Sequence, residues 1–490
     1  MLATLGPADA AVAADVPPQA VGSWSMVPQT KDANGDGAID GDGGVPRRGA
    51  LSSQPSPERV GAGNRIAQPN ERLIDGTLSW YLSERGFPVR LDACDSRGDR
   101  ARWTITAADG SRRTLPWSRL GARTCTRIAT LGEGAYTAEL QVASGARTDR
   151  RSFPVVVRNL LVVALGDSYA SGEGNPRNVR SWLRDGGSFT PYWDDDACRR
   201  SVRGAPAQAA LALERSDPRT SVTLVFVACS GATVDSGILA PQSGAGQSES
   251  QVEQAARILG GRAADLVTVS IGGNDVGFGS ILQTCALTSD CPLARPSGGI
   301  LARYGTVNGG VQAQTAGLGP ALDRIAACLG GSGCILADGR TTAGIALATT
   351  GRVLPTLYPD ITRGVDGGPC TYLSIPAADF AWARATLLSP APAPTYAYSL
   401  AAGGTATLSV ANGSLNQQLA ASARLPRWSP VVGTWSASAD PAVGHGVCAG
   451  DAAWAYGFTG FTALPSASFH PNPAGQAAMA AAITAAMRSS

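Results

Sequence analysis

The sequence lacks several features that mark whole classes of protein. It has no apolar run of about 18 residues, so we expect no transmembrane helix. Lys31 is its only lysine, and a net charge of +2 over 490 residues gives no reason to expect nucleic acid or an anionic membrane as a partner. No two cysteines have the CxxC spacing, which argues against zinc ribbons. A content of 44% hydrophobic and 16% charged residues indicates a globular chain, and its length predicts roughly two or three domains.

Ten cysteines are present, and this even number favours five disulfides in an oxidising compartment. The alanine-rich segment 1–15 is similar to the end of a signal peptide but lacks a preceding basic region. Either the start codon is assigned too late, or this segment is a disordered tail. We expect a secreted monomer. Its expected pairings are Cys94–Cys125, Cys198–Cys229 and Cys370–Cys448, with Cys285, Cys291, Cys328 and Cys334 paired among themselves in an order that the sequence leaves open.

Residues 1–61 are expected to be an irregular segment containing one acidic, glycine-rich loop. Oxygen-bearing side chains occupy positions 1, 3, 5 and 9 of this loop, with glycine at position 6, as in an EF-hand. Position 12 is Gly43 instead of a bidentate glutamate, and no flanking helices are evident. A structural Ca²⁺ site and a plain acidic linker therefore both remain open. The Ca²⁺ ligands would be Asp32, Asn34, Asp36 and Asp40.

Residues 62–157 are expected to form a small β-domain. The stretches 102–106 and 136–142 alternate between polar and apolar residues, and 154–157 closes the unit. The segment around Tyr136 resembles the tyrosine region of PKD or immunoglobulin-like sandwiches. Cys94 and Cys125 flank Trp103, although their separation is short for a true immunoglobulin pair. We therefore predict an Ig/PKD-like sandwich that serves as a spacer or binding module.

From residue 158 to residue 490 the pattern changes to strands that alternate with helices. Strands are expected at 160–165, 221–228 and 265–271, and their nearly continuous apolar sequence is typical of a parallel sheet covered on both faces. Helices are expected at 205–213, 251–259, 416–423 and 473–488, the last with Asn472 as N-cap and Pro473 in its first turn. This alternation predicts a three-layer α/β/α domain.

Polar residues follow each of the three expected strands. The first strand leads into Gly166-Asp167-Ser168-Tyr169, the second into Cys229-Ser230-Gly231, and the third into Gly273-Asn274-Asp275. Ligands bind at the carboxyl ends of strands in open α/β sheets. A serine nucleophile needs a base, and His470, just before the last expected helix, is the better candidate. His445 lies beside Cys448 and is expected to be structural.

An ester carbonyl under attack develops a negative oxygen that requires hydrogen-bond donors already in place. The backbone N–H of Ser168 is one candidate donor. Gly231 is a second, because the missing side chain lets its backbone approach a substrate. The side-chain amide of Asn274 is a third. Each residue alone could simply form a turn, but their joint position at successive strand ends favours a catalytic site.

Together, Gly166-Asp167-Ser168-Tyr169, Gly231, Gly273-Asn274-Asp275 and His470 resemble the four blocks of the SGNH (GDSL-type) hydrolases, over about residues 159–488. The resemblance is to secreted, disulfide-rich actinobacterial esterases and phospholipase-like enzymes. Their second-block serine is also preceded by cysteine, as Ser230 is here, and a Gly-His-Gly-x-Cys segment recurs in them. The resemblance implies that Ser168 is the nucleophile, that His470 is the base, and that Ser168, Gly231 and Asn274 form the oxyanion hole.

One position departs from the family pattern. The family usually has aspartate three residues before the histidine, where this chain has Ala467. Such an acid normally holds the imidazole tautomer. Some members of the subgroup use a backbone carbonyl instead, so we predict that the carbonyl of Ala467 or Ser468 accepts the His470 Nδ1–H. A remote acid, Asp451 or Asp275, is the alternative.

The leading hypothesis is a secreted serine esterase or lipase that acts through an acyl-enzyme with a Ser-His dyad. It needs no cofactor for catalysis, and its ester could be a lipid or an acylated glycan. The competing hypothesis is a weakly active or inactive cell-surface or matrix-binding protein that uses the Ig-like domain. The absent aspartate favours this second hypothesis, and the joint presence of Ser168, Gly231, Asn274 and His470 opposes it.

Overall fold

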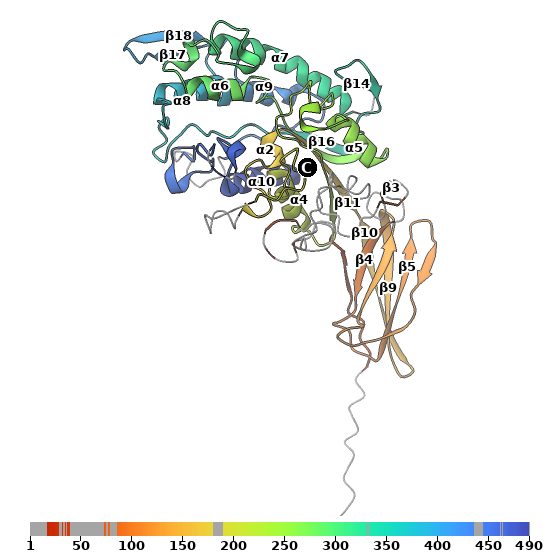
Figure 1. Ribbon diagram of the computed structural model, residues 1–490. Helices are drawn as coiled ribbons and strands as arrows, with labels where there is room; N and C mark the ends of the chain where they lie inside the picture. Colours follow the sequence, from red (N-terminus) through yellow and green to blue (C-terminus); the bar gives the residue numbers. More distant parts are fainter. Residues whose placement is uncertain are drawn as a thin grey trace, which may run out of the picture. The chain divides into compact units, whose positions relative to one another are not determined.

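The chain forms two compact units (Figure 1). Unit 1 comprises Met1–Val27, Glu84–Asn159 and Pro218–Thr220, and unit 2 comprises Pro28–Ser83, Leu160–Asp217 and Ser221–Ser490. The structure is a computed structural model that describes residues 17–28, 32, 35, 37–39, 73–74, 77–78, 86–179, 190–330, 333–435, 444–460, 462 and 464–489.

Unit 1 is built from two antiparallel sheets. The first has the order β1-β4-β8, formed by Ser23–Met26, Phe87–Asp92 and Thr126–Leu131. The second has the order β10-β9-β5-β6, with β7 also paired to β5, formed by Arg147–Val157, Gly134–Ser144, Arg100–Ala107, Arg112–Thr114 and Ser118–Arg119. The N-terminal segment expected to be irregular thus contributes strand β1, because Ser23–Met26 pairs with β4 along its whole length.

The core of unit 1 surrounds Trp103, which is fully buried together with Leu91 and Leu140. The Tyr136 hydroxyl donates to the carbonyl of Gly132 at 3.0 Å, a contact back to the backbone four residues upstream. The β-rich character of this region agrees with the expectation, whereas its Ig/PKD-like class stays a prediction.

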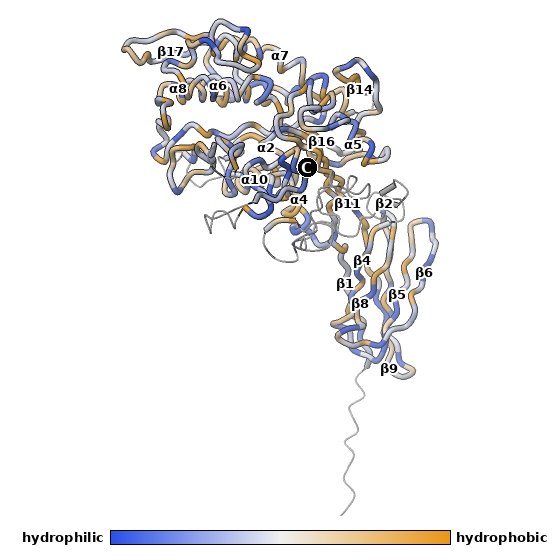
Figure 2. The backbone as a smooth tube through the Cα atoms, in the orientation of Figure 1, coloured by the Kyte–Doolittle hydropathy of each residue, from blue (hydrophilic) through white to orange (hydrophobic). Residues whose placement is uncertain are grey.

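The central sheet of unit 2 has the order β12-β11-β13-β16, formed by Ser221–Phe226, Asn159–Gly166, Ala264–Ser270 and Leu347–Pro355. The pairs β11–β13 and β13–β16 are parallel, which confirms the predicted parallel sheet. Figure 2 colours the tube around β11 and β16 mainly as hydrophobic, whereas the strands of unit 1 alternate. Burial from both sides explains this difference, since all six residues of β12 are buried.

Helices surround this sheet and complete a mixed α/β unit. Helices α4 and α10 pack on each other (Figure 1) and line a small cavity with Thr268 and Ser270 of β13, which places them on one face of the sheet. Helices α5 and α10 have the bounds that the sequence predicts. The helices are α2 (Ser168–Ser171), α4 (Ala205–Glu214), α5 (Gln251–Leu259), α6 (Phe278–Cys285), α7 (Val307–Cys328), α8 (Ala377–Ala383), α9 (Leu415–Ala421) and α10 (Pro473–Arg488), and a π-helical turn (Arg384–Leu388) follows α8.

Three small hairpins complete the strands: β2–β3 (Leu73–Ile74 and Thr77–Leu78), β14–β15 (Cys334–Ile335 and Thr341–Thr342) and β17–β18 (Thr395–Ser399 and Thr405–Ser409). The ten cysteines form five disulfides. They are the three expected pairs Cys94–Cys125, Cys198–Cys229 and Cys370–Cys448, and the pairs Cys285–Cys291 and Cys328–Cys334 that the sequence left open. None of the helices in the described ranges has the length and apolar character needed to cross a bilayer.

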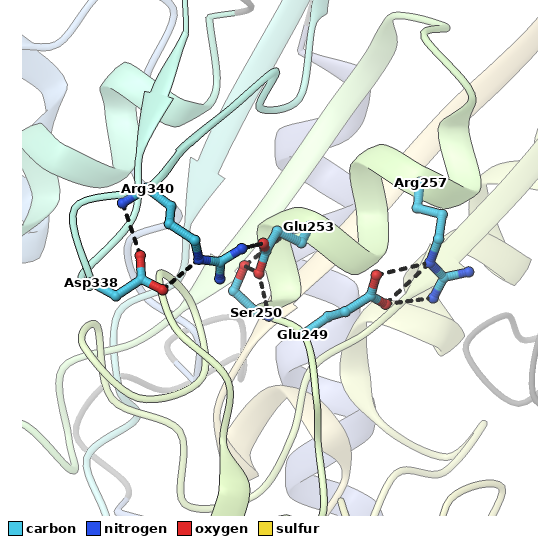
Figure 3. A network of polar contacts seen from close by, with 6 residues as sticks. All are labelled: Glu249, Ser250, Glu253, Arg257, Asp338 and Arg340. Carbon is cyan, nitrogen blue, oxygen red and sulfur yellow. Dashed lines mark hydrogen bonds and ion pairs between the residues drawn. The ribbon is translucent and has the colours of Figure 1, made fainter.

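The start of α5 is fixed by a polar network (Figure 3). Ser250 caps the helix by accepting from the Glu253 N–H at 3.1 Å, and Glu253 in return accepts from the Ser250 N–H at 2.9 Å. Arg340 then joins Glu253 at 2.9 Å to Asp338 at 2.6 Å. This cap fixes the helix start next to Gln251, whose side chain is hydrogen-bonded to Gly166 at the end of β11.

Candidate active site

Ser168 lies at the turn where β11 ends and α2 begins. Gly166 has a φ of 143°, and a Cβ there would lie 2.4 Å from the carbonyl oxygen of Ser270, so only glycine fits. The side chain of Gln251 accepts from the Gly166 N–H and donates to its carbonyl, both at 2.8 Å. The backbone that carries Ser168 is therefore held by hydrogen bonds on both of its polar groups.

Asp167 anchors this turn from inside the protein. Its carboxylate accepts from the Tyr169 N–H and the Ser270 hydroxyl, each at 3.1 Å, and from the Tyr358 hydroxyl. Tyr358 in turn accepts from the Gly273 N–H at 2.9 Å, which connects the ends of three strands. Burial raises the pKa of Asp167 to about 7, although these hydrogen bonds act in the opposite direction.

His470 contacts the Ser168 hydroxyl directly. Its Nε2 lies 2.8 Å from Ser168 Oγ, and its Nδ1 lies 3.0 Å from the carbonyl oxygen of Ser468. Because a carbonyl only accepts, Nδ1 carries the proton and Nε2 presents its lone pair to the serine. Burial lowers the pKa of His470, while the negative charge of Glu173 and nearby backbone carbonyls oppose that shift. The imidazole is thus neutral and ready to accept a proton near pH 7.

The loop 468–472, which carries His470, takes its shape from a strained residue. Phe469 has a φ of 63°, in the left-handed region that side chains rarely adopt. The Tyr169 hydroxyl donates to the Phe469 carbonyl at 2.9 Å, and the His470 N–H donates to the Ala467 carbonyl at 2.9 Å. The sequence predicts either of two carbonyls as the partner of Nδ1. The Ser468 carbonyl makes this hydrogen bond, whereas the Ala467 carbonyl accepts from the backbone N–H of His470.

The alternative acids and the second histidine lie elsewhere. Asp451 is exposed, and Asp275 accepts from the Val234 N–H at 3.0 Å. Within the described ranges, no carboxylate oxygen is hydrogen-bonded to His470. His445 stacks on Trp454 at 3.7 Å between ring centroids and uses Nδ1 on the carbonyl of Ala452, which agrees with a structural role.

Ser168 and Asn274, two of the three expected oxyanion donors, line the same pocket. Gly231 has a φ of 79° and is exposed. The Asn274 side-chain amide donates one hydrogen to the Ala232 carbonyl at 2.9 Å, which fixes its orientation and leaves its second hydrogen available. The N–H groups of Ser168 and Gly231 donate to no protein atom in the part of the chain that the structure describes. These groups can serve a negatively charged oxygen without breaking an existing bond.

An apolar pocket opens beside Ser168 and Asn274. Its walls come from α6, α8, the π-helical turn, α9 and the loop before α10, and include Phe278, Leu282, Phe380, Leu387, Leu415 and Phe469. The aromatic residues Tyr192 and Trp193 do not line it. Trp193 instead packs in a small apolar cluster with Tyr456, Leu464 and Ala467.

Most of the predicted calcium loop falls outside the described residues. Asn34, Asp36 and Asp40 lie outside the described residues. Asp32 accepts from the Gly37 N–H at 2.9 Å and pairs with Arg215 at 2.6 Å. A cationic partner already occupies this carboxylate, and the calcium site stays a prediction.

Two supporting residues carried no signal in the sequence. Gln251 and Tyr358 reach the site from positions 85 and 191 residues away from their partners Gly166 and Asp167. Neither belongs to a turn or to a strand end with recognisable spacing, so only the folded backbone reveals them.

No family model matches the chain. Part of it is 35% identical over 151 residues to Lipase 1 of Streptomyces coelicolor, covering 30% of this chain and 41% of that protein. Another alignment gives 33% identity over 128 residues to Lipase of Streptomyces rimosus, covering 26% of this chain and 35% of that protein. The chain thus spans less than half of the length of these curated relatives. The crystal structure of an extracellular lipase from Streptomyces rimosus aligns with a TM-score of 0.39 and 21% identity, over 67% of this chain and 99% of that one.

Proposed function

We propose, from the premise that this chain is a member of the SGNH (GDSL-type) hydrolase family, that it hydrolyses carboxylic esters with a Ser-His dyad. The observation that carries the proposal is the 2.8 Å contact between Ser168 Oγ and His470 Nε2. The N–H of Ser168 itself has no protein acceptor in the described chain. The similarity to proteins named lipase supports the same class of reaction.

In the first half-reaction, Ser168 Oγ attacks the ester carbonyl carbon while its proton passes to His470 Nε2. The carbonyl oxygen becomes negative and receives hydrogen bonds from the N–H groups of Ser168 and Gly231 and from the Asn274 amide. The imidazolium then protonates the departing alcohol oxygen. The C–O bond to the alcohol breaks and leaves an acyl group on Ser168.

In the second half-reaction, His470 takes a proton from water, and the resulting hydroxide attacks the acyl carbon. The same donors stabilise the second negatively charged oxygen. Collapse of this intermediate returns the proton to Ser168 and releases the carboxylic acid. The Ser468 carbonyl keeps Nδ1 protonated throughout, so no carboxylate needs to touch the ring.

The apolar pocket next to Ser168 suits an aliphatic acyl chain, as in a lipid ester. Short acyl groups on a glycan would contact fewer of the residues that line the pocket. Both kinds of substrate are carboxylic esters, as the proposal requires. The five disulfides support a site of action outside the cytosol. The competing role as a matrix-binding protein is not favoured, because it gives no reason for the Ser168–His470 contact.

The test uses p-nitrophenyl esters of increasing acyl length with the full chain. We expect turnover by the wild type and none above background by Ser168→Ala or His470→Ala, with folding checked by thermal unfolding. Medium or long chains should give a higher kcat/KM than acetate. Equal rates for the wild type and Ser168→Ala on every ester would contradict the proposal that the chain is an ester hydrolase.

A further inference from the structure

Glu173 is a buried acidic residue close to the nucleophile in sequence and in space. It follows α2 by two positions and is only 2% exposed. Its N–H donates to the carbonyl of Ser168 at 3.1 Å, so its backbone is fixed relative to the serine. Nothing in the ester hydrolysis described above uses its side chain.

The Glu173 carboxylate has a single protein partner in the described chain. Its Oε2 accepts from the Ser230 hydroxyl, and its Oε1 is buried without a hydrogen-bond partner there. None of the ion pairs found in the described ranges includes Glu173. A buried charge without a cation is costly, which calls for a group that becomes positive nearby.

His470 is such a group. The Asn175 side-chain amide donates to the Glu173 carbonyl at 3.1 Å and to the Pro471 carbonyl at 2.7 Å, and so ties the glutamate to the residue that follows the histidine. The negative charge of Glu173 raises the pKa of His470 and opposes the effect of burial. The imidazole gains its positive charge when Ser168 gives up its proton.

Other titratable groups near the ring do not supply this charge. The Tyr169 ring lies 5.3 Å from the imidazole, and burial raises the pKa values of Tyr169 and Tyr456 beyond the range in which they ionise. The carboxyl group of Asp167 is occupied by hydrogen bonds from the Tyr358 hydroxyl, the Ser270 hydroxyl and the Tyr169 N–H. Glu173 is the charged residue that acts on His470 in the described structure.

Resting on the proposed function, we propose that Glu173 is a positioning residue that stabilises the His470 imidazolium through space. It takes no proton itself, because the proton of Ser168 moves only to His470 Nε2. Through Ser230 it also holds the turn that carries Gly231. The carboxylate that acts on the imidazole thus comes from the segment that follows the nucleophile. The position three residues before the histidine, which usually holds an aspartate, is Ala467 in this chain.

The test compares Glu173→Gln, which removes the charge and keeps the shape, with Ser230→Ala, which keeps the charge and removes the hydrogen bond. For Glu173→Gln we expect kcat to fall about tenfold. The acid limb of the kcat/KM profile should move to lower pH, because loss of the negative charge makes the imidazole a weaker base. Ser230→Ala should lower kcat and leave the acid limb in place.

Two outcomes would overturn the inference: an acid limb of Glu173→Gln that coincides with that of the wild type, or an equal displacement in Ser230→Ala. In either case the wild type still hydrolyses esters, whereas absence of wild-type turnover would reject the proposed function instead. If Glu173→Gln does not fold, Glu173→Ala can be assayed with added formate or formamide. Rescue by formate alone supports the charge, and equal rescue by both molecules contradicts it.

Discussion

The carbonyl oxygen of Ser468 lies 3.0 Å from Nδ1 of His470, two residues further along the same loop. This short connection works because Phe469, between them, has a φ of 63° and turns the Ser468 carbonyl toward the ring. The orientation of the base is therefore built into the backbone. The aspartate that usually orients such a histidine can therefore be absent, and the tautomer with the proton on Nδ1 is still maintained.

The first prediction follows from this backbone contact. Asp451→Ala and Ser468→Ala should each keep activity within about tenfold of the wild type, because both leave the Ser468 carbonyl in place. His470→Ala should lose a thousandfold or more, on the order seen when a catalytic base is removed. Initial rates on one p-nitrophenyl ester are sufficient for the comparison. A thousandfold loss in Asp451→Ala would reveal a remote acid and contradict the dyad.

The second prediction concerns pH and stability. Burial raises the pKa of Asp167 from 3.8 to about 7, so the folded chain binds a proton there more tightly than the unfolded chain does. The free energy of unfolding should therefore fall as pH rises from about 4 to 7, by on the order of 4 kcal/mol at most from this group. Asp275, with a pKa raised to about 6 by burial, acts in the same direction.

Asp167→Asn cannot ionise and should flatten this pH dependence in urea unfolding of the full chain. The slope between pH 4 and pH 7 is the readout, since the absolute stability also changes with the altered hydrogen bonds. Exposed Asp451→Ala serves as control and should keep the wild-type slope. If the slope of Asp167→Asn equals that of the wild type, the buried carboxyl does not titrate as described.

The third prediction uses two disulfides of equal span. Cys94–Cys125 lies in unit 1 and Cys198–Cys229 in unit 2, and each has a sequence separation of 31. Chain entropy gives both a similar stabilising effect of about 2–4 kcal/mol. Only Cys229 adjoins the Ser230-Gly231 turn, so the double Ser variant of Cys198–Cys229 should lose more activity. Assays at a temperature where both variants remain folded check this, and equal losses would contradict it.

The fourth prediction concerns acyl length. Leu282 of α6 lines the apolar pocket, and Leu287, just beyond the end of the same helix, is 71% exposed. Leu282→Trp should fill part of the pocket, lower kcat/KM for long acyl chains about tenfold or more, and spare acetate. Leu287→Trp should leave the chain-length profile unchanged. A uniform loss on all esters in Leu282→Trp would show damage to the fold instead of a filled pocket.

Local sequence was sufficient for elements with strong boundary signals. Helix α10 begins where Asn472 caps it and Pro473 enters its first turn, and both residues mark that start unambiguously. Helix α7 was not predicted, because its 22 residues include several glycines and Pro320, which disfavour an isolated helix. It forms because buried residues such as Val311 and Leu322 pack into the core of unit 2.

The site divides in the same way. Ser168, Gly231 and Asn274 come within five residues of the ends of β11, β12 and β13, and His470 precedes the last helix, so local sequence was sufficient to select them as candidates. Gln251 and Tyr358 support the serine through contacts that depend on how distant segments pack. The Ser468 carbonyl could be proposed from the missing aspartate, but its choice over Ala467 depends on the backbone dihedral of Phe469.

The division of the chain into units has a consequence for recombination between genes. Ala38 and Ile39 belong to the hydrophobic core of unit 2, although β1 of unit 1 precedes them and β4 follows them. Unit 1 in turn includes Pro218–Thr220, from within the stretch that carries the sheet of unit 2. A crossover at residue 159 would therefore transfer neither unit intact. Because the segments of unit 1 and unit 2 alternate along the sequence, we expect the two units to be inherited together.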